Sequence, residues 1–269
     1  IDSLNESENL KKITDDLNIT QDVMIRVSPS IDPHTHLLTT TGVLDSKFGF
    51  SIETGDAEKA IESLMSIDSL NLLGLHFHLG SPIFELEPYA EAIEYVYKFS
   101  AEMKNKYGLD IREFSPGGGF AIGYETDKKP LPISDYAKII GDAVKKACDL
   151  NGFNVPKIIL EPGRALVGRS GVSIYRIGSI KSIPGVRNYI SVDGGMGDNI
   201  RPALYGSEYS VFSVTKILEK EGLMKSTISG KFCESGDYLA RDVEIPNPAI
   251  DDLLALPASG AYNLAMASN

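Results

Sequence analysis

The sequence predicts an α/β fold in which part of a parallel barrel is followed by a mostly β domain. Apolar, strand-like runs alternate with amphipathic helices up to about residue 163, and each run leads into a polar or Gly-rich loop. Beyond it, short β-type runs are separated by Gly and Pro. Alternating strands and helices indicate a parallel sheet, and TIM barrels carry their chemistry at the strands' carboxyl ends. We therefore predict a partial (β/α)8 TIM barrel, its C-terminal half, over residues 1–164 and a β domain over residues 165–269.

The predicted barrel segment is built from short apolar runs and longer amphipathic ones. The apolar runs predict strands over residues 23–27, 72–77, 111–115 and 157–161. Apolar residues at helical spacing predict helices over residues 6–17, 57–65 and 85–107. The first of these should carry Leu10, Ile13 and Leu17 on one face, and a further helix should be capped by Ser134. We expect Thr54 or Asp56 to cap the second helix. A complete barrel has eight strands in about 250 residues, so we expect the first half of the barrel to be absent from this sequence.

The second part is predicted to be β-rich with little helix. Strand-like runs cover residues 172–183, 189–192, 227–233 and 253–256. A modest helical pattern covers residues 214–221.

Composition excludes several classes of partner. The net charge of -11 and the pI near 4.9 argue against a nucleic-acid groove and against binding to an anionic membrane surface. Two cysteines are too few for a disulfide framework, which fits a reducing cytoplasm. We see no apolar run of transmembrane length.

Two histidines end a predicted buried strand. Alternate side chains of a strand share a face, so His76 and His78 should point the same way. They form either the floor of an active site or a pair of satisfied core histidines. His34 and His36 also have the spacing of metal ligands, but no histidine follows position 78. We therefore predict no metal site.

Other short motifs each have a structural and a functional reading. The run Gly117-Gly118-Gly119 is either a tight turn or an anion-binding loop. A carboxylate at a barrel mouth is costly unless it is paired, so Glu161 should face a cation or a protonated nitrogen; the structural alternative is an ion pair with Arg164. Cys233 could be a small buried hydrophobe.

Taken together and in order, the motifs HFHLGS, GGGF, EPGR, DGGM, RPALY, CESGD and GAY resemble those of the pyridoxal-phosphate-dependent decarboxylases of the alanine-racemase-like barrel fold. The resemblance covers essentially the whole chain and is greatest to the diaminopimelate decarboxylases. It implies decarboxylation of meso-2,6-diaminopimelate to L-lysine and carbon dioxide, the last step of lysine biosynthesis.

The resemblance also implies how the cofactor, pyridoxal 5'-phosphate, is held. His78 would stack on its ring, and Glu161 would keep its pyridine nitrogen protonated, which makes the ring an electron sink. The phosphate-binding residues would be Ser81, Gly117, Gly118 and Gly119. Further cofactor contacts would come from Gly163, Arg164 and Tyr262.

The substrate has two amino and two carboxylate groups, and the residues implied to bind it are Arg164, Arg201, Tyr205, Glu234 and Tyr262. Two arginines and a carboxylate complement that charge pattern. Cys233 would donate the proton that quenches the carbanion. The segment with Cys233 and Glu234 would reach the partner's active site, which implies a homodimer, and the final segment would return towards the active site.

The sequence departs from the family pattern at one position: no lysine matches the family's Schiff-base lysine, which lies early in the barrel. We therefore expect this chain, as given, not to form a Schiff base with the cofactor. We also expect it not to fold stably alone. Two alternatives stay open, namely an ornithine- or arginine-type decarboxylase of the same fold and a non-catalytic relative that acts as a binding or regulatory partner.

Overall fold

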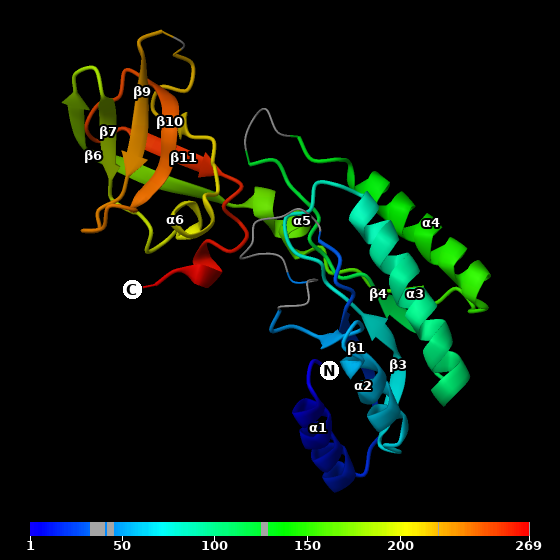
Figure 1. Ribbon diagram of the computed structural model, residues 1–269. Helices are drawn as coiled ribbons and strands as arrows, with labels where there is room; N and C mark the ends of the chain where they lie inside the picture. Colours follow the sequence, from blue (N-terminus) through cyan, green and yellow to red (C-terminus); the bar gives the residue numbers. More distant parts are fainter. Residues whose placement is uncertain (33–40, 42–45, 125–128, 220, 269) are drawn as a thin grey trace. The chain divides into compact units, whose positions relative to one another are not determined.

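The computed structural model describes residues 1–32, 41, 46–124, 129–219 and 221–268 (Figure 1). By packing, the chain forms two compact units, one of residues 1–121 and 131–162 and one of residues 122–130 and 163–269. Residues 122–124 and 129–130 therefore pack with the second unit although they lie within the predicted barrel segment. The assignment of residues 1–164 and 165–269 to functional domains stays a prediction.

The first unit contains a parallel sheet of five strands in the order β2-β1-β3-β4-β5. This confirms the predicted α/β class with a parallel sheet. The strands are β1 (Gln21–Ser28), β2 (Phe50–Ser51), β3 (Leu70–His76), β4 (Glu113–Ser115) and β5 (Lys157–Ile158). Because all run the same way, their carboxyl ends lie at one edge of the sheet, which is where loops of such folds carry function.

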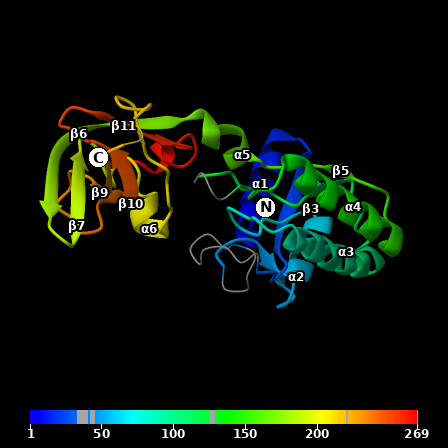
Figure 2. The same ribbon diagram turned by 90° about the horizontal axis from the view of Figure 1, so that it is seen from above.

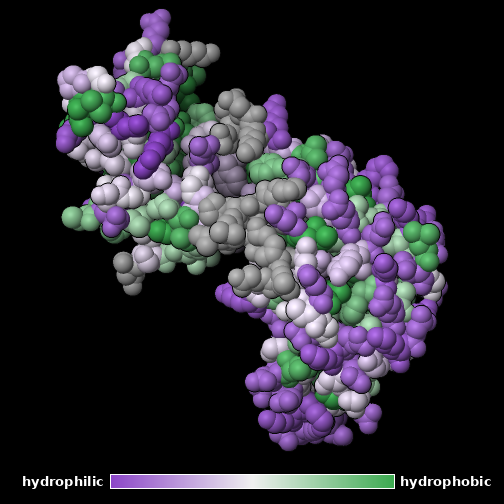
Figure 3. All heavy atoms as spheres, viewed as in Figure 1, coloured by the Kyte–Doolittle hydropathy of each residue, from purple (hydrophilic) through white to green (hydrophobic). Residues whose placement is uncertain are grey.

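Four helices accompany this sheet, close to where the periodicity predicts them: α1 (Leu4–Leu17), α2 (Asp56–Met65), α3 (Glu87–Tyr107) and α4 (Ile133–Asn151). The two long helices, α3 and α4, lie side by side (Figure 2). Beneath them the rings of Tyr97 and Phe114 pack with centroids 5.0 Å apart. The outward face of these helices is mostly hydrophilic (Figure 3).

The predicted helix caps and one predicted helix face are wrong. Gly55 and Pro132 stand at the N-cap positions of α2 and α4, and neither helix has a side-chain cap. In α1 the buried residues are Ser7 and Thr14, whereas Ile13 is 54% exposed. The buried Thr14 hydroxyl donates to the Ser69 hydroxyl at 2.9 Å.

The second unit is a six-stranded sheet in the order β10-β9-β7-β6-β11-β8, antiparallel except between β7 and β9. The strands are β6 (Val172–Ile183), β7 (Arg187–Val192), β8 (Phe212–Ser213), β9 (Leu223–Ser229), β10 (Tyr238–Pro246) and β11 (Leu253–Pro257). Its core includes Tyr175, Ile190, Ile228 and Leu254. The short helices are α5 (Gly163–Val167), η2 (Gly168–Ser170), α6 (Arg201–Tyr205) and η3 (Leu264–Met266).

Two expectations for this unit are wrong. The described residues between 214 and 221 form turns, because the Lys216 side chain pairs with Asp252 at 2.9 Å and its backbone N–H donates to Ser213 Oγ. The strand expected over residues 227–233 ends at Ser229. There the Asp237 carboxylate accepts the Phe232 N–H at 2.7 Å and bends the chain away from the sheet.

In the part of the chain that the structure describes, no helix is long and apolar enough to cross a membrane. Among the same residues no group of three or more His, Cys, Asp or Glu side chains is arranged to hold a metal ion. The candidate ligands His34 and His36 lie outside the described residues.

Candidate functional site

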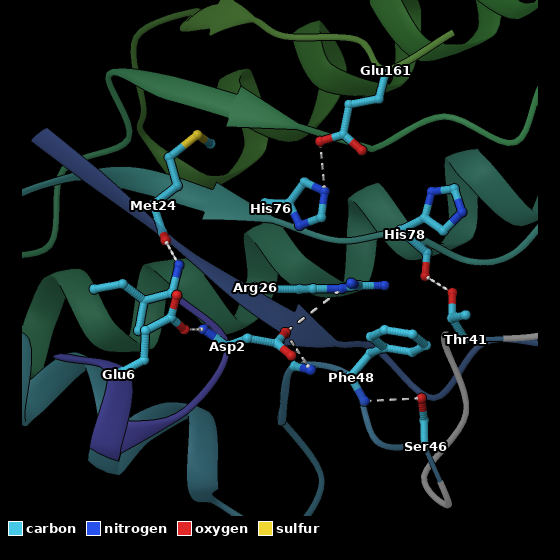
Figure 4. Close-up of polar contacts among 12 residues, drawn as sticks. Asp2, Glu6, Met24, Arg26, Thr41, Ser46, Phe48, His76, His78 and Glu161 are labelled. Atoms are coloured by element: carbon cyan, nitrogen blue, oxygen red, sulfur yellow. Dashed lines mark hydrogen bonds and ion pairs between the residues drawn. The ribbon is translucent and has the colours of Figure 1, made fainter. Parts of the chain in front are cut away.

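The first group of candidate residues lies at the carboxyl ends of β1, β3 and β5 (Figure 4). Along this stretch of β3 and its extension, His76 and His78 are half-buried while Phe77 and Leu79 are buried, so the two histidines share a face as the alternation predicts. Arg26 of β1 lies next to them in Figure 4, and Glu161 approaches from beyond β5. The sheet thus gathers two imidazoles, a guanidinium and a carboxylate.

The Glu161 carboxylate contacts the imidazole ring of His76. Oε1 of Glu161 lies 3.0 Å from Nε2 of His76, and the ring N–H is not aligned for a hydrogen bond. The contact with His76 lowers the pKa of the Glu161 carboxyl below its usual value, and His78 and Arg26 add to this effect. The Glu161 side chain is 50% exposed. Glu161 is therefore an ionised and accessible carboxylate.

His78 is held as a neutral ring. Its Nδ1 accepts the backbone N–H of Gly118 at 3.2 Å, which leaves the ring proton on Nε2. Burial, together with the nearby Arg26, lowers the pKa of His78 to about 4. The backbone carbonyl of His78 accepts from the Thr41 hydroxyl at 2.6 Å. His78 is thus neither a satisfied core residue nor a cation at neutral pH, but a fixed, half-buried aromatic ring.

The three glycines after β4 are required by close backbone packing. A Cβ on Gly118 would lie 2.0 Å from the carbonyl oxygen of Glu161, and one on Gly119 would lie 2.2 Å from that of Gly80. Gly117 has a φ of +73°, which favours glycine, and its added Cβ would meet His78 Nδ1 at 2.8 Å.

Two of the three glycine backbone N–H groups already donate hydrogen bonds within the protein. Gly117 donates to Ser115 Oγ and Gly118 to His78. Ser81 is half-buried in the loop after β3. A role for Ser81 and the glycines in binding phosphate stays a prediction.

Arg26 is a member of this group that the sequence reasoning missed. Its guanidinium lies 4.4 Å from the centre of the Phe48 ring and 3.9 Å from the Asp2 carboxylate. Burial lowers the pKa of Arg26. An arginine within an apolar strand was the available signal, because a charge in a buried strand is costly unless it has partners.

A second group of candidate residues lies in the second unit, where two buried arginines face one tyrosine. The guanidinium carbons of Arg164 on α5 and Arg201 on α6 lie 4.5 Å and 5.3 Å from the centre of the Tyr262 ring. Both arginines are 4% exposed, whereas Tyr262 is 40% exposed. Arg201 also lies 5.3 Å from the ring of Tyr205. Among the described residues, Arg201 Nε is buried without a hydrogen-bond partner.

The geometry of this second group suits an anion. Tyr262 has a φ of +68°, a left-handed conformation that is uncommon for a residue with a side chain and that concentrates at functional sites. A guanidinium group can bind a carboxylate through two parallel N–H donors. Two of them beside an accessible ring can therefore bind carboxylates, for which the guanidinium fork is the best-suited protein group.

Cys233 and Glu234 lie elsewhere in the second unit, in the exposed turn between β9 and β10. Glu234 lines a pocket of about 310 Å³ together with Arg187, Tyr189 and Arg241. The expectation that Cys233 ends a strand is wrong, and its function stays a prediction.

The comparisons with known proteins identify the family of the chain. Residues 1–168 match the family model described as "Pyridoxal-dependent decarboxylase, pyridoxal binding domain". The chain belongs to the pyridoxal-dependent decarboxylases. It contains the binding domain of that family as far as residue 168, which includes the His76, His78, Glu161 and glycine group.

Individual members of the family are similar over the whole chain. A diaminopimelate decarboxylase of Bacillus subtilis (strain 168) is 41% identical over 269 residues, which are 100% of this chain and 61% of the relative. The crystal structure of diaminopimelate decarboxylase from M. jannaschii superposes with a TM-score of 0.89 at 33% identity and covers 100% of this chain and 60% of that one.

A third relative was solved with a ligand. The diaminopimelate decarboxylase of Helicobacter pylori complexed with L-lysine has a TM-score of 0.85 at 31% identity and covers 99% of this chain and 63% of that one. The chain spans about three fifths of the length of these relatives. The predicted family is confirmed.

Proposed function

We propose that the protein is a diaminopimelate decarboxylase that uses pyridoxal 5'-phosphate and releases L-lysine and carbon dioxide. The observation that carries the proposal is the pair of buried arginines, Arg164 and Arg201, on the ring of Tyr262. A second carboxylate distinguishes diaminopimelate from ornithine and arginine, and a carboxylate is the ligand that such a pair accepts. The relatives named diaminopimelate decarboxylase support the same substrate.

The fold proposed for the complete protein is an eight-stranded TIM barrel. The parallel sheet of β1 to β5, with its functional side chains at one edge, is the arrangement that such barrels use. We assign residues 1–164 to this barrel and residues 165–269 to a β domain, and the final segment with Tyr262 is proposed to return towards the active site.

The first group of residues fits the cofactor. Neutral His78 offers a flat ring for stacking, and the ionised, accessible Glu161 can hold a proton on the pyridine nitrogen. The glycines leave no room for side chains beside His78. We propose that these glycines and Ser81 bind the phosphate of the cofactor. Further contacts with the cofactor are proposed for Gly163, Arg164 and Tyr262. Pyridoxal phosphate held by these residues would supply an electron sink for the loss of carbon dioxide.

We assign the other groups to the substrate. Arg164, Arg201, Tyr205 and Tyr262 are proposed to hold the carboxylate that is retained, and Glu234 is proposed to bind an amino group. As carbon dioxide leaves, the thiol of Cys233 donates its proton to the carbon that lost the carboxylate. Both cysteines in the described residues are free, so the thiol is available for this step.

We further propose a homodimer in the cytoplasm. Cys233 and Glu234 are exposed on the turn between β9 and β10. That placement is the one expected if this turn completes the active site of a second copy of the chain.

The experiment is an assay of carbon dioxide release from meso-diaminopimelate, ornithine and arginine. It uses the product of the complete gene, saturated with pyridoxal phosphate. We expect release from diaminopimelate alone. Preferred release from ornithine or arginine would assign the protein to a diamine-forming decarboxylase instead, and no release from any of the three would indicate a non-catalytic relative.

A further inference from the structure

Tyr124 contacts both arginines of the second unit. It lies in residues 122–124, which pack with that unit. Its hydroxyl accepts a hydrogen bond from Arg164 Nη1. Its ring centre lies 6.0 Å from the guanidinium carbon of Arg201 and 5.7 Å from that of Arg164. No motif in the sequence marks this tyrosine.

Tyr124 is itself held on two sides. Its ring packs edge-on against Tyr209, with the centroids 5.2 Å apart and an interplanar angle of 78°. Its carbonyl oxygen accepts the backbone N–H of Ser210 at 3.2 Å. Tyr209 is 3% exposed, and its hydroxyl lies 3.4 Å from Asn263 Oδ1, in the residue next to Tyr262. The support of Tyr124 is therefore continuous with the segment that covers the arginines.

We propose that Tyr124 is a positioning residue that fixes Arg164 and Arg201 as one carboxylate-binding pair. The inference rests on the proposed function, because it assigns the carboxylate to the substrate's retained end. An arginine side chain has many rotamers, and holding it in one costs entropy. Tyr124 restricts Arg164 through the hydroxyl and Arg201 through the ring, so the pair is arranged before the ligand arrives. Tyr124 acts through the arginines and touches no reacting atom.

Replacing Tyr124 by phenylalanine separates this role from a merely structural one. Tyr124→Phe keeps the packing on Tyr209 and the ring beside Arg201, and it removes only the acceptor of Arg164. The probes are L-lysine and pentane-1,5-diamine, which differ by one carboxylate. We expect the dissociation constant for L-lysine to rise about tenfold, the effect of losing one hydrogen bond to a charged group. The constant for the diamine should change less than about twofold.

The measurement is titration calorimetry on the cofactor-loaded product of the complete gene, with Tyr95→Phe as the matched control. Tyr95 lies on α3 and is 37% exposed, so removing its hydroxyl should change neither constant. In a parallel assay with diaminopimelate, Tyr124→Phe should raise KM about tenfold and leave kcat nearly unchanged.

The outcomes separate the two proposals. Equal effects of Tyr124→Phe on L-lysine and on the diamine, or no effect on either, would overturn the role of Tyr124 even in a protein that decarboxylates diaminopimelate. A selective loss of L-lysine affinity in a protein without that activity would support Tyr124 and overturn the proposed function. A tenfold fall in kcat at constant KM would also overturn the positioning role, because it would place Tyr124 in the chemical step.

Discussion

The two units place their candidate residues by different means. In the first unit the backbone does so: strand alternation sets His76 and His78 on one face, and Gly118 brings the chain within contact of Glu161. In the second unit the side chains do so, because Arg164 and Arg201 are held by aromatic rings and hydroxyls rather than by strands. The first group is thus built into the backbone of a sheet, whereas the second is built from side chains on short helices.

The largest effect should follow from disturbing the backbone of the first unit. In Gly118→Ala the new Cβ would lie 2.0 Å from the Glu161 carbonyl oxygen, and backbone atoms cannot yield as side chains do. We expect the free energy of unfolding to fall by more than about 3 kcal/mol.

Gly141→Ala on α4 is the control for Gly118→Ala. An added Cβ at Gly141 meets nothing within 4 Å, so this helical position should be neutral or gain up to about 1 kcal/mol. Both variants are measured by urea denaturation. Equal stabilities of the two variants would contradict the claim that backbone packing holds this group.

The second effect concerns pH. His78 has a pKa of about 4 in the folded protein and its ordinary value of 6.5 in the unfolded chain. Between these values the unfolded chain binds a proton that the folded protein does not, so stability falls as the pH decreases from 6.5 to 4. We expect a loss of up to about 3 kcal/mol over this range that His78→Gln lacks.

Urea denaturation of the wild type and of His78→Gln at pH values from 4 to 7 measures this difference. Carboxylates such as Glu161 lose stabilisation at the acidic end in both proteins, so only the difference between the two curves reports His78. Parallel curves would show that His78 titrates freely and is not held neutral by burial.

The smallest effect should come from the side-chain group of the second unit. Arg201 is 4% exposed and its Nε has no partner among the described residues, so its burial costs stability. Arg201→Met should leave the free energy of unfolding unchanged or raise it by about 1 kcal/mol. Thermal and urea unfolding measure this, with Arg187→Met as the control. Arg187 bonds Thr227 and Asp242, and its loss should be destabilising.

The comparison also explains which parts the sequence could predict. Alternation and helical periodicity are local, so the facing histidines, the parallel strands and the long helices α3 and α4 were predictable. Arg26 was visible as a charge in an apolar strand. Tyr124 was not, because its contacts with Arg164 and Ser210 depend on how distant segments pack.

The wrong predictions of secondary structure also arise from contacts between distant segments. Asp237 stops β9 before Cys233 by accepting backbone N–H groups of Met196 and Phe232, which a propensity for strand cannot reveal. Lys216 replaces a helix by a turn through its pairing with Asp252. In both cases a polar contact between distant segments outweighs the local pattern.

We propose that Arg164 and Arg201 together bind a carboxylate of the substrate. The most direct test is the dissociation constant of L-lysine for the cofactor-loaded wild type and for Arg201→Met, both made from the complete gene. We predict that the variant binds L-lysine at least about 100-fold more weakly, the effect of removing one partner of a buried charge pair, while its stability is not reduced. Unchanged affinity for L-lysine in a folded Arg201→Met protein would contradict the claim.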